Sequence, residues 1–203
     1  MRILTLRGLG KAAVNLLFVL LFALLTLSSY RQLIASGSLR SLGILAVNML
    51  FLTLFLSRRP ATQETDAPGL WALGVLGSLL PLLMRPTGGS GSTPGAALQL
   101  AGLAMLVTSL MSLRTRFAVV PANRGVCGTG LYRLVRHPIY LSELTVFLGV
   151  TLDNPTPGNL TILVIECALQ WVRARAEEQL LGTDPQYAAY RRRVRYRLIP
   201  GLL

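Results

Sequence analysis

The sequence predicts an all-α protein, a polytopic bundle of membrane-spanning helices. Of its 203 residues, 52% are hydrophobic and only 14% are charged, and the mean hydropathy is +0.56. The apolar residues gather in long runs, and most of the basic residues fall in alternate connections between those runs. This composition excludes a soluble cytosolic domain of ordinary make-up. It predicts a protein whose chemistry takes place at or near a lipid bilayer.

Residues 1–113 are predicted to form an N-terminal region of transmembrane helices. A helix needs about 20 apolar residues to cross roughly 30 Å of hydrocarbon. The candidate spans are Ala12–Ser29, Leu39–Ser57, Leu70–Met84 and Ala96–Leu113, of which the third is short. The first run is longer than the apolar part of a typical signal peptide, and no small-x-small cleavage site precedes Tyr30. We therefore expect it to be retained as a span.

Two shorter apolar runs follow, Ile139–Leu152 and Leu160–Val172. Both lie below the usual length of a crossing helix. They flank Asp153–Asn159, a segment rich in proline, glycine and asparagine, which are residues typical of turns. The pattern predicts a C-terminal helical hairpin in the membrane.

The basic residues predict the orientation. With a cytoplasmic N-terminus, 17 of the 20 Lys and Arg residues lie on the cytoplasmic side, and only Arg31, Arg40 and Arg85 lie outside. This asymmetry follows the positive-inside rule, so the net charge of +12 needs no nucleic-acid partner. Both termini are expected to be cytoplasmic. Nearly all the basic residues are arginine, which favours a GC-rich genome and therefore a bacterial inner membrane.

The sequence offers little for metal or disulfide chemistry. It holds one histidine, His137, and two cysteines, Cys127 and Cys167, which stand far apart in the chain. Zinc and haem motifs need clustered histidine or cysteine ligands, and a disulfide framework needs more cysteines. We expect no metal.

A polar segment precedes the hairpin, from Arg114 to Pro138. Proline disfavours a helical conformation for the residue before it and is favoured in the first turn of a helix, so the first hairpin helix should begin at Pro138. The positive end of that helix would then lie beside Arg136 and His137, where it could attract a carboxylate or a phosphate. The alternative is that Arg133 and Arg136 are interfacial anchors and His137 only starts the helix.

A second polar segment follows the hairpin, from Arg173 to Pro200. Arg173 and Glu177 stand four residues apart, which places them on one helix face, and the adjacent carboxylates of Glu177 and Glu178 could hold a cationic group. The alternative is an ordinary Arg–Glu helix pair. Residues 187–197 are basic with interspersed tyrosines, as expected of an interfacial tail held by anionic lipid.

Together these segments resemble the isoprenylcysteine carboxyl methyltransferase family, within an integral-membrane superfamily that also includes phospholipid N-methyltransferases. The resemblance covers the C-terminal region and not the N-terminal spans. Its residues are Gly130-x-Tyr132-Arg133-x-x-Arg136-His137-Pro138-x-Tyr140, then Arg173-x-x-x-Glu177-Glu178, Tyr187-x-x-Tyr190 and Pro200. One departure is Ser142, where many members have glycine.

The resemblance implies that residues 114–203 form a methyltransferase region, with a cytoplasmic S-adenosyl-L-methionine site between the segments that flank the hairpin. A lipophilic acceptor would enter from the bilayer. Arg173 would be the catalytic residue and would bind the acceptor together with Glu178. The implied cofactor-binding residues are Gly125, Val126, Cys127, Tyr132, His137, Pro138, Ile139, Tyr140 and Glu177.

The chemistry of the cofactor suits these residue types. The positive end of the Pro138 helix with His137 suits its carboxylate, Glu177 suits its ammonium, and tyrosine faces suit a sulfonium. A carboxylate acceptor is already ionised at neutral pH and needs only alignment, for instance by paired hydrogen bonds from Arg173. An amine acceptor would need a base, such as Glu178.

Glu143 and Glu166 fall inside the predicted hairpin. Ionisable groups are costly at that depth and suggest a functional role along the substrate path, although a buried pair or a protonated carboxyl are alternatives.

Three other functions stay open beside isoprenylcysteine O-methylation: phospholipid N-methylation, a nicotinamide-dependent membrane reductase, and a non-catalytic scaffold or transporter.

Overall fold

The computed structural model describes residues 6–57, 59, 61–86 and 93–201. It divides into two units, Met1–Arg58 and Arg59–Leu203. Helices dominate both units, and the only sheet in the described part of the chain pairs the two-residue strands β1 (Gln63–Glu64) and β2 (Ala122–Asn123). The predicted all-α membrane bundle is therefore confirmed.

The first unit is a hairpin of two long helices, α1 (Leu6–Ser36) and α2 (Leu39–Ser57). Gly37 separates them with a φ of +59°, a left-handed conformation that glycine adopts readily at the end of a helix. The Ser38 hydroxyl then accepts a hydrogen bond from the Ser41 backbone N–H, which caps α2. Phenylalanine rings from both helices stack between them, and the Asn48 amide donates to the Ser29 hydroxyl at 2.7 Å.

Three helices in the described residues are long and apolar enough to cross a membrane: Ala12–Ser36, Leu39–Ser57 and Thr93–Arg116. The expected third span is shorter than these. It comprises α3 (Pro68–Leu79) and a 3-10 turn, η1 (Leu80–Leu83). Pro81 has no backbone N–H to continue the α-helical ladder, so the regular helix ends before it.

The second unit carries the remaining helices, α4 (Thr93–Leu113), α5 (Pro138–Asp153), α6 (Pro157–Leu181) and α7 (Pro185–Arg193). Short 3-10 turns lie in the connection from α4 to α5, namely η2 (Arg114–Arg116) and η3 (Gly130–Arg133). Each of α5, α6 and α7 has proline in its first turn, where the missing N–H costs nothing. Thr156 and Asp184 cap α6 and α7 by accepting backbone hydrogen bonds.

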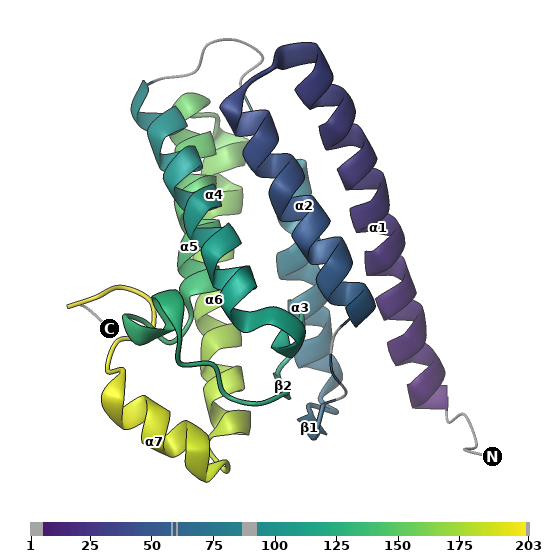
Figure 1. Cartoon of the computed structure of the whole chain (residues 1–203), viewed down its shortest axis with the longest axis vertical. Helices are drawn as coiled ribbons and strands as arrows, with labels where there is room; N and C mark the ends of the chain where they lie inside the picture. Colours follow the sequence, from purple (N-terminus) through teal and green to yellow (C-terminus); the bar gives the residue numbers. More distant parts are fainter. Residues whose placement is uncertain (1–5, 58, 60, 87–92, 202–203) are drawn as a thin grey trace. The chain divides into compact units, whose positions relative to one another are not determined.

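The predicted hairpin is present as α5 and α6, and α6 is much longer than the apolar run that predicted it. It continues past Val172 to Leu181 without a break, so Arg173, Glu177 and Glu178 lie on the same rigid helix as the membrane segment. Figure 1 shows the C-terminal half of α6, η3, α7 and the C-terminal segment together at one end of this unit. The polar segments on either side of the hairpin therefore meet, as the sequence predicted.

Glycines let α4 and α5 pack backbone against backbone. A Cβ atom added to Gly102 of α4 would lie 2.7 Å from Val146 Cγ2 and 2.8 Å from the Val146 backbone nitrogen. A Cβ on Gly149 of α5 would lie 2.7 Å from the Gly95 carbonyl oxygen. Close crossings at small residues are typical of helix pairs in membranes, where van der Waals contact drives association.

We predict that Gly102→Ala destabilises the second unit, because the added methyl group meets the α5 backbone rather than a movable side-chain end. The expected loss is about 1–3 kcal/mol. Thermal unfolding of the purified protein in detergent measures it. Gly69→Ala is the control, since a Cβ there meets nothing within 4 Å, and its effect should lie between zero and a gain of about 1 kcal/mol. Equal melting temperatures for the two variants would contradict the close packing.

Candidate active site

The segment before α5 is held by the C-terminal segment of the chain. Val135 forms a parallel bridge with Tyr196. The Arg136 backbone N–H donates to the Tyr196 carbonyl at 2.9 Å, and the His137 N–H donates to the Arg197 carbonyl at 3.0 Å. These hydrogen bonds fix the backbone of Arg136 and His137 just before α5 begins, and so they fix the positions from which the two side chains extend.

Glu178 is the centre of the charge network at this end of the unit. Its Oε1 accepts from Arg136 Nε at 2.8 Å, from Arg197 Nε at 3.1 Å and from His137 Nε2 at 3.2 Å, while Oε2 accepts from Arg197 Nη2 at 2.8 Å. The side chain is only 4% exposed. Burial alone would raise the pKa of Glu178, but the hydrogen bonds from His137, Arg197 and Arg136 outweigh it and hold the pKa well below its usual range. Glu178 therefore stays ionised and fully engaged.

Glu177 lies in a different setting although it is the next residue. Its Oε2 accepts a hydrogen bond from the Tyr140 hydroxyl at 3.1 Å and lies 3.7 Å from His137 Nδ1. The side chain is 30% exposed, so part of the carboxylate can reach a ligand. The structure thus brings together Tyr140 and Glu177, which lie far apart in the sequence, within contact of a single small molecule.

Arg173 lies one turn before Glu177 and beside the same tyrosine. Its guanidinium carbon is 4.9 Å from the centre of the Tyr140 ring. Nη1 donates to Gln170 Oε1 at 3.0 Å and Nη2 donates to the Val119 carbonyl at 3.1 Å. Gly77 of α3 leaves room for it, since a Cβ there would be 3.1 Å from Nη1. The buried arginine is therefore held in one place.

The ring of Tyr140 is shared between its neighbours. It stacks on the His137 imidazole with centroids 5.4 Å apart and planes at 5°, and it also carries the Arg173 guanidinium. Pro138 and Ile139, which lie between His137 and Tyr140 in the chain, are both buried. The first turn of α5 is thus a rigid platform that links Arg173 to Glu177.

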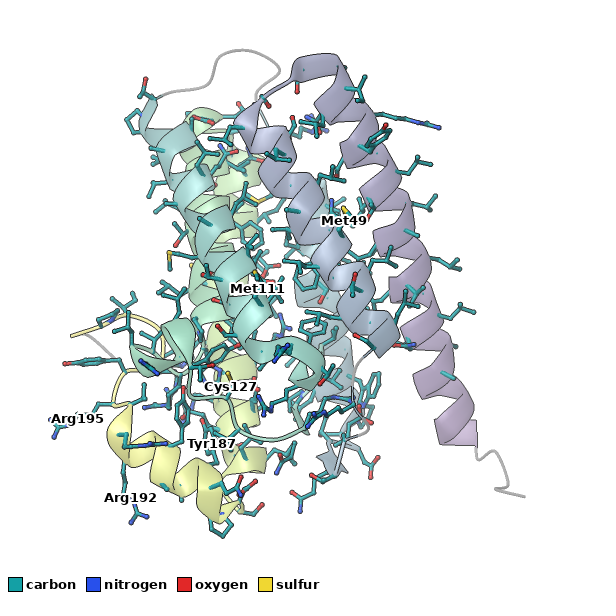
Figure 2. The ribbon with its side chains drawn as sticks, in the orientation of Figure 1. Met49, Met111, Cys127, Tyr187, Arg192 and Arg195 are labelled. Carbon is teal, nitrogen blue, oxygen red and sulfur yellow. The ribbon has the colours of Figure 1, made fainter. Side chains whose placement is uncertain are left out.

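Tyr132 and Cys127 lie in a neighbouring apolar cluster, where both pack with Tyr187, Tyr190 and Val194, and Val126 packs against it. Figure 2 shows Cys127 and Tyr187 close together beside α7. Burial raises the pKa of the Tyr132 phenol well above its usual value, and the nearby charge of Glu177 raises it further. Tyr132 therefore lies in this cluster as a neutral phenol, within electrostatic range of Glu177.

Gly125 lies upstream of that cluster with a φ of +97°, and its N–H donates to the Asn123 side chain at 3.0 Å. The left-handed conformation explains glycine at this position. The Cys127 thiol donates to the Ser112 carbonyl at 3.3 Å. The predicted upstream residues Gly125, Val126 and Cys127 therefore lie in a shaped loop, next to the tyrosine cluster.

The burial of the arginines and tyrosines bears on two interpretations made from the sequence. Arg133 is exposed, as an interfacial anchor would be, but Arg136 is buried and bound to Glu178. In α7 the arginines at 191–193 are exposed, while Tyr187 and Tyr190 are buried in the protein rather than in lipid. Figure 2 shows Arg192 and Arg195 projecting away from the ribbon.

Sequence reasoning missed Gln170, Val119 and Arg197. A signal for Gln170 was available, because Glu166, Gln170, Arg173 and Glu177 follow the spacing of one helix face. No local signal marks Val119, which contributes only its backbone carbonyl. Arg197 reaches Glu178 through a long-range pairing that the sequence does not encode locally.

In the described part of the chain, no group of three or more His, Cys, Asp or Glu residues could hold a metal ion.

Comparison with known proteins finds a family model that matches part of the C-terminal region. Residues 92–185 match the model of the phospholipid methyltransferase family. That family belongs to the same integral-membrane methyltransferase superfamily as the isoprenylcysteine carboxyl methyltransferases. No curated protein matches the chain. The superfamily inferred from the motifs is confirmed, and the match supports an integral-membrane methyltransferase.

We predict that the Glu178 network makes stability depend on pH. A carboxylate whose pKa is lowered by folding stabilises the protein fully above its unfolded pKa and loses that contribution as the pH falls further. The loss should begin near pH 4.5, the ordinary pKa of a glutamate. Glu178→Gln should lower the melting temperature at neutral pH, because Arg136 then stays buried with a weaker partner.

The measurement is the melting temperature of the wild type and of Glu178→Gln in detergent, from neutral to acidic pH. The wild type should lose its advantage over the variant as the pH falls. The comparison cancels the contribution of the other carboxylates, which the two proteins share. A constant difference across the whole range would contradict the assignment.

Proposed function

We propose that this integral-membrane protein transfers a methyl group from S-adenosyl-L-methionine to the polar group of a lipophilic acceptor, at the end of the bundle where α5 begins and α6 emerges. The observation that carries the proposal is the contact of Tyr140 with both Glu177 and Arg173. It joins an accessible carboxylate to a buried guanidinium through one side chain. The match to a methyltransferase family supports the same reaction class.

The residues present fit the charged parts of the cofactor. Glu177 is partly exposed, and among the described residues it accepts a hydrogen bond from Tyr140 and lies 3.7 Å from His137 Nδ1, so it can also accept hydrogen bonds from the cofactor's ammonium. The positive end of α5, beside His137, suits the cofactor's carboxylate. The ring of Tyr140 already contacts His137 and Arg173. Tyr140 therefore contributes through its hydroxyl group, which orients the Glu177 carboxylate. When bound, the cofactor supplies an electrophilic methyl group on a sulfonium.

Arg173 is proposed to bind the acceptor. A guanidinium has five N–H donors, and hydrogen bonds to Gln170 and Val119 use two of them. Nε is buried and has no partner among the described residues. The remaining donors can orient an acceptor oxygen for in-line displacement, which needs alignment and exclusion of water rather than a base when the acceptor is a carboxylate.

Glu178 fits a positioning role better than the substrate-binding role expected from the sequence. Both of its oxygens accept hydrogen bonds from cations, and its lowered pKa makes it a poor base. It acts through Arg136 and His137, which it holds at the entrance to α5. In this proposal Glu178 orients the cofactor site without contacting the acceptor.

The acceptor separates two forms of the proposal. Isoprenylcysteine carboxyl O-methylation is the reaction that the motifs most resemble, and phospholipid N-methylation is an alternative that the family match supports equally. Purified protein with methyl-labelled cofactor should yield a base-labile methyl ester on a prenylcysteine analogue, or base-stable label on phosphatidylethanolamine.

Titration with S-adenosylhomocysteine and NADPH distinguishes both methyltransferase reactions from a nicotinamide-dependent reductase. Binding of NADPH alone would refute the proposed function.

We predict that Glu177→Gln and Arg173→Ala fail at different steps. Glu177→Gln should weaken S-adenosylhomocysteine binding by about 10- to 100-fold, since it removes a charge-assisted hydrogen bond. Arg173→Ala should leave that affinity nearly unchanged but lose most turnover. Calorimetric titration and labelled-methyl transfer measure the two effects. Arg191→Ala, at an exposed position of α7, is the control. An equal loss of cofactor affinity in both variants would contradict this division of roles.

A further inference from the structure

Arg173 is a buried cation that contacts no carboxylate directly. It lies on a polar stripe of α6, formed by Gln170, Arg173 and Glu177, which are three and four residues apart. Its side-chain hydrogen bonds within the described residues go to neutral atoms, Gln170 Oε1 and the Val119 carbonyl oxygen. None of the ion pairs in the described part of the chain involves it. A buried guanidinium is costly without a negative charge nearby, so its counter-ion must act without direct contact.

Two glutamates of the hairpin are close enough to serve as that counter-ion. Glu143 of α5 and Glu166 of α6 both lie within electrostatic range of Arg173. Glu166 is 0% exposed, and neither of its oxygens has a hydrogen-bond partner among the described residues. Glu143 differs, because its Oε2 accepts a hydrogen bond of 2.7 Å from Gln170 Nε2. Of the two, Glu143 is therefore the one with a described donor to stabilise a negative charge.

Gln170 joins this carboxylate to the guanidinium. Its side chain is 0% exposed, its oxygen accepts from Arg173 Nη1 at 3.0 Å, and its nitrogen donates to Glu143. A guanidinium has only donors and a carboxylate has only acceptors, so the amide fits between them in one orientation. The three side chains form one continuous donor–acceptor chain, and moving any member breaks a buried hydrogen bond.

The amide also keeps the two charges apart. A carboxylate in direct contact with Arg173 would form paired hydrogen bonds and would occupy the donors that an acceptor oxygen needs. With Gln170 in between, Glu143 balances the positive charge while Arg173 Nε keeps no partner among the described residues. The Val119 carbonyl holds Nη2 from another segment, so the guanidinium is fixed at both of its terminal nitrogens.

We propose that Glu143 is the counter-ion of Arg173 and, through Gln170, a positioning residue for the transfer reaction. This inference rests on the proposed role of Arg173 in binding the acceptor, and it gives Glu143 and Gln170 roles that need no contact with the acceptor. Without the charge of Glu143, the guanidinium would turn toward Glu177, one helix turn away, and would lose its alignment with the acceptor.

Turnover tests the positioning role with the full chain in phosphatidylcholine nanodiscs. The acceptor probes are N-acetyl-farnesylcysteine and phosphatidylethanolamine, and the variants are compared on the probe that the wild type methylates. Q170L removes both hydrogen bonds at similar volume, whereas E143Q removes the charge but keeps an acceptor oxygen. Each should lower kcat/KM for the acceptor by about tenfold or more, because Arg173 then lacks a positioning bond or its counter-charge. The affinity for S-adenosylhomocysteine should stay unchanged.

Gln99 provides a matched control. Like Gln170 it is a buried glutamine that donates to a carboxylate, Asp153 Oδ2, at 2.6 Å. Asp153 ends α5, roughly 15 Å along the helix from Glu143. Q99L therefore removes a buried hydrogen bond of the same kind far from Arg173, and it should leave kcat/KM unchanged. An equal loss of turnover in Q99L and Q170L would overturn the positioning role. If Q170L does not fold, Q170N, which is too short to reach both partners, should show the same loss.

Melting temperatures in detergent identify the counter-ion without turnover. E143Q should lower the melting temperature of the wild type, because it leaves Arg173 buried without a balancing charge. In the Arg173→Ala background E143Q should instead raise it, since there it removes an unbalanced carboxylate. E166Q should shift the melting temperature by the same amount in both backgrounds. A dependence on Arg173 for E166Q and none for E143Q would overturn the assignment of Glu143.

The outcomes separate this inference from the proposed function. Methyl transfer with wild-type kcat/KM in both Q170L and E143Q would overturn the positioning role and leave the methyltransferase proposal intact. Failure of the wild type to bind S-adenosylhomocysteine would instead refute the proposed function. The melting temperatures of E143Q with and without Arg173 would still test the counter-ion in that case.

Discussion

One buried carboxylate organises the polar end of the second unit. Glu178 binds Arg136 and His137 from the segment before α5, and Arg197 from the C-terminal segment. The guanidinium groups of Arg136 and Arg197 would each be costly to bury alone, and each becomes acceptable because the two share the same carboxylate. The short bridge between Val135 and Tyr196 brings the backbones together, and the ion pairs lock them. The start of α5, and every candidate site residue on it, depends on this arrangement.

The geometry of α6 places the adjacent residues Glu177 and Glu178 in different surroundings. Successive side chains on a helix point about 100° apart, so Glu178 faces the buried cations while Glu177 faces Tyr140 and remains partly exposed. The same helix carries Arg173 and Gln170 on the stripe of Glu177. A rigid helix thus sets the spacing between the proposed cofactor contact and the proposed acceptor contact, which is the kind of fixed alignment that a displacement reaction requires.

The membrane part of the second unit supports this alignment by tight packing. Glycines on α4 and α5 allow their backbones to touch, and Gly77 of α3 leaves space for the Arg173 guanidinium. At the other end, the Asn159 side chain accepts from the Arg85 N–H and donates to the Arg85 carbonyl, which ties the end of η1 to the turn between α5 and α6. The site therefore sits on a hairpin that is fixed at both ends.

The sequence by itself determined the membrane class, the hairpin, the helix start at Pro138 and the superfamily, because hydropathy, proline chemistry and short motifs act locally. It also selected Tyr140, Glu177 and Arg173 as one site. Only the tertiary structure decided which of the two adjacent glutamates is accessible, that Arg136 is buried, and that Arg197 bonds to Glu178 and Gln170 to Arg173. Those outcomes depend on contacts between segments distant in the chain, where burial and shared hydrogen bonds, rather than residue type, set the role of each charge.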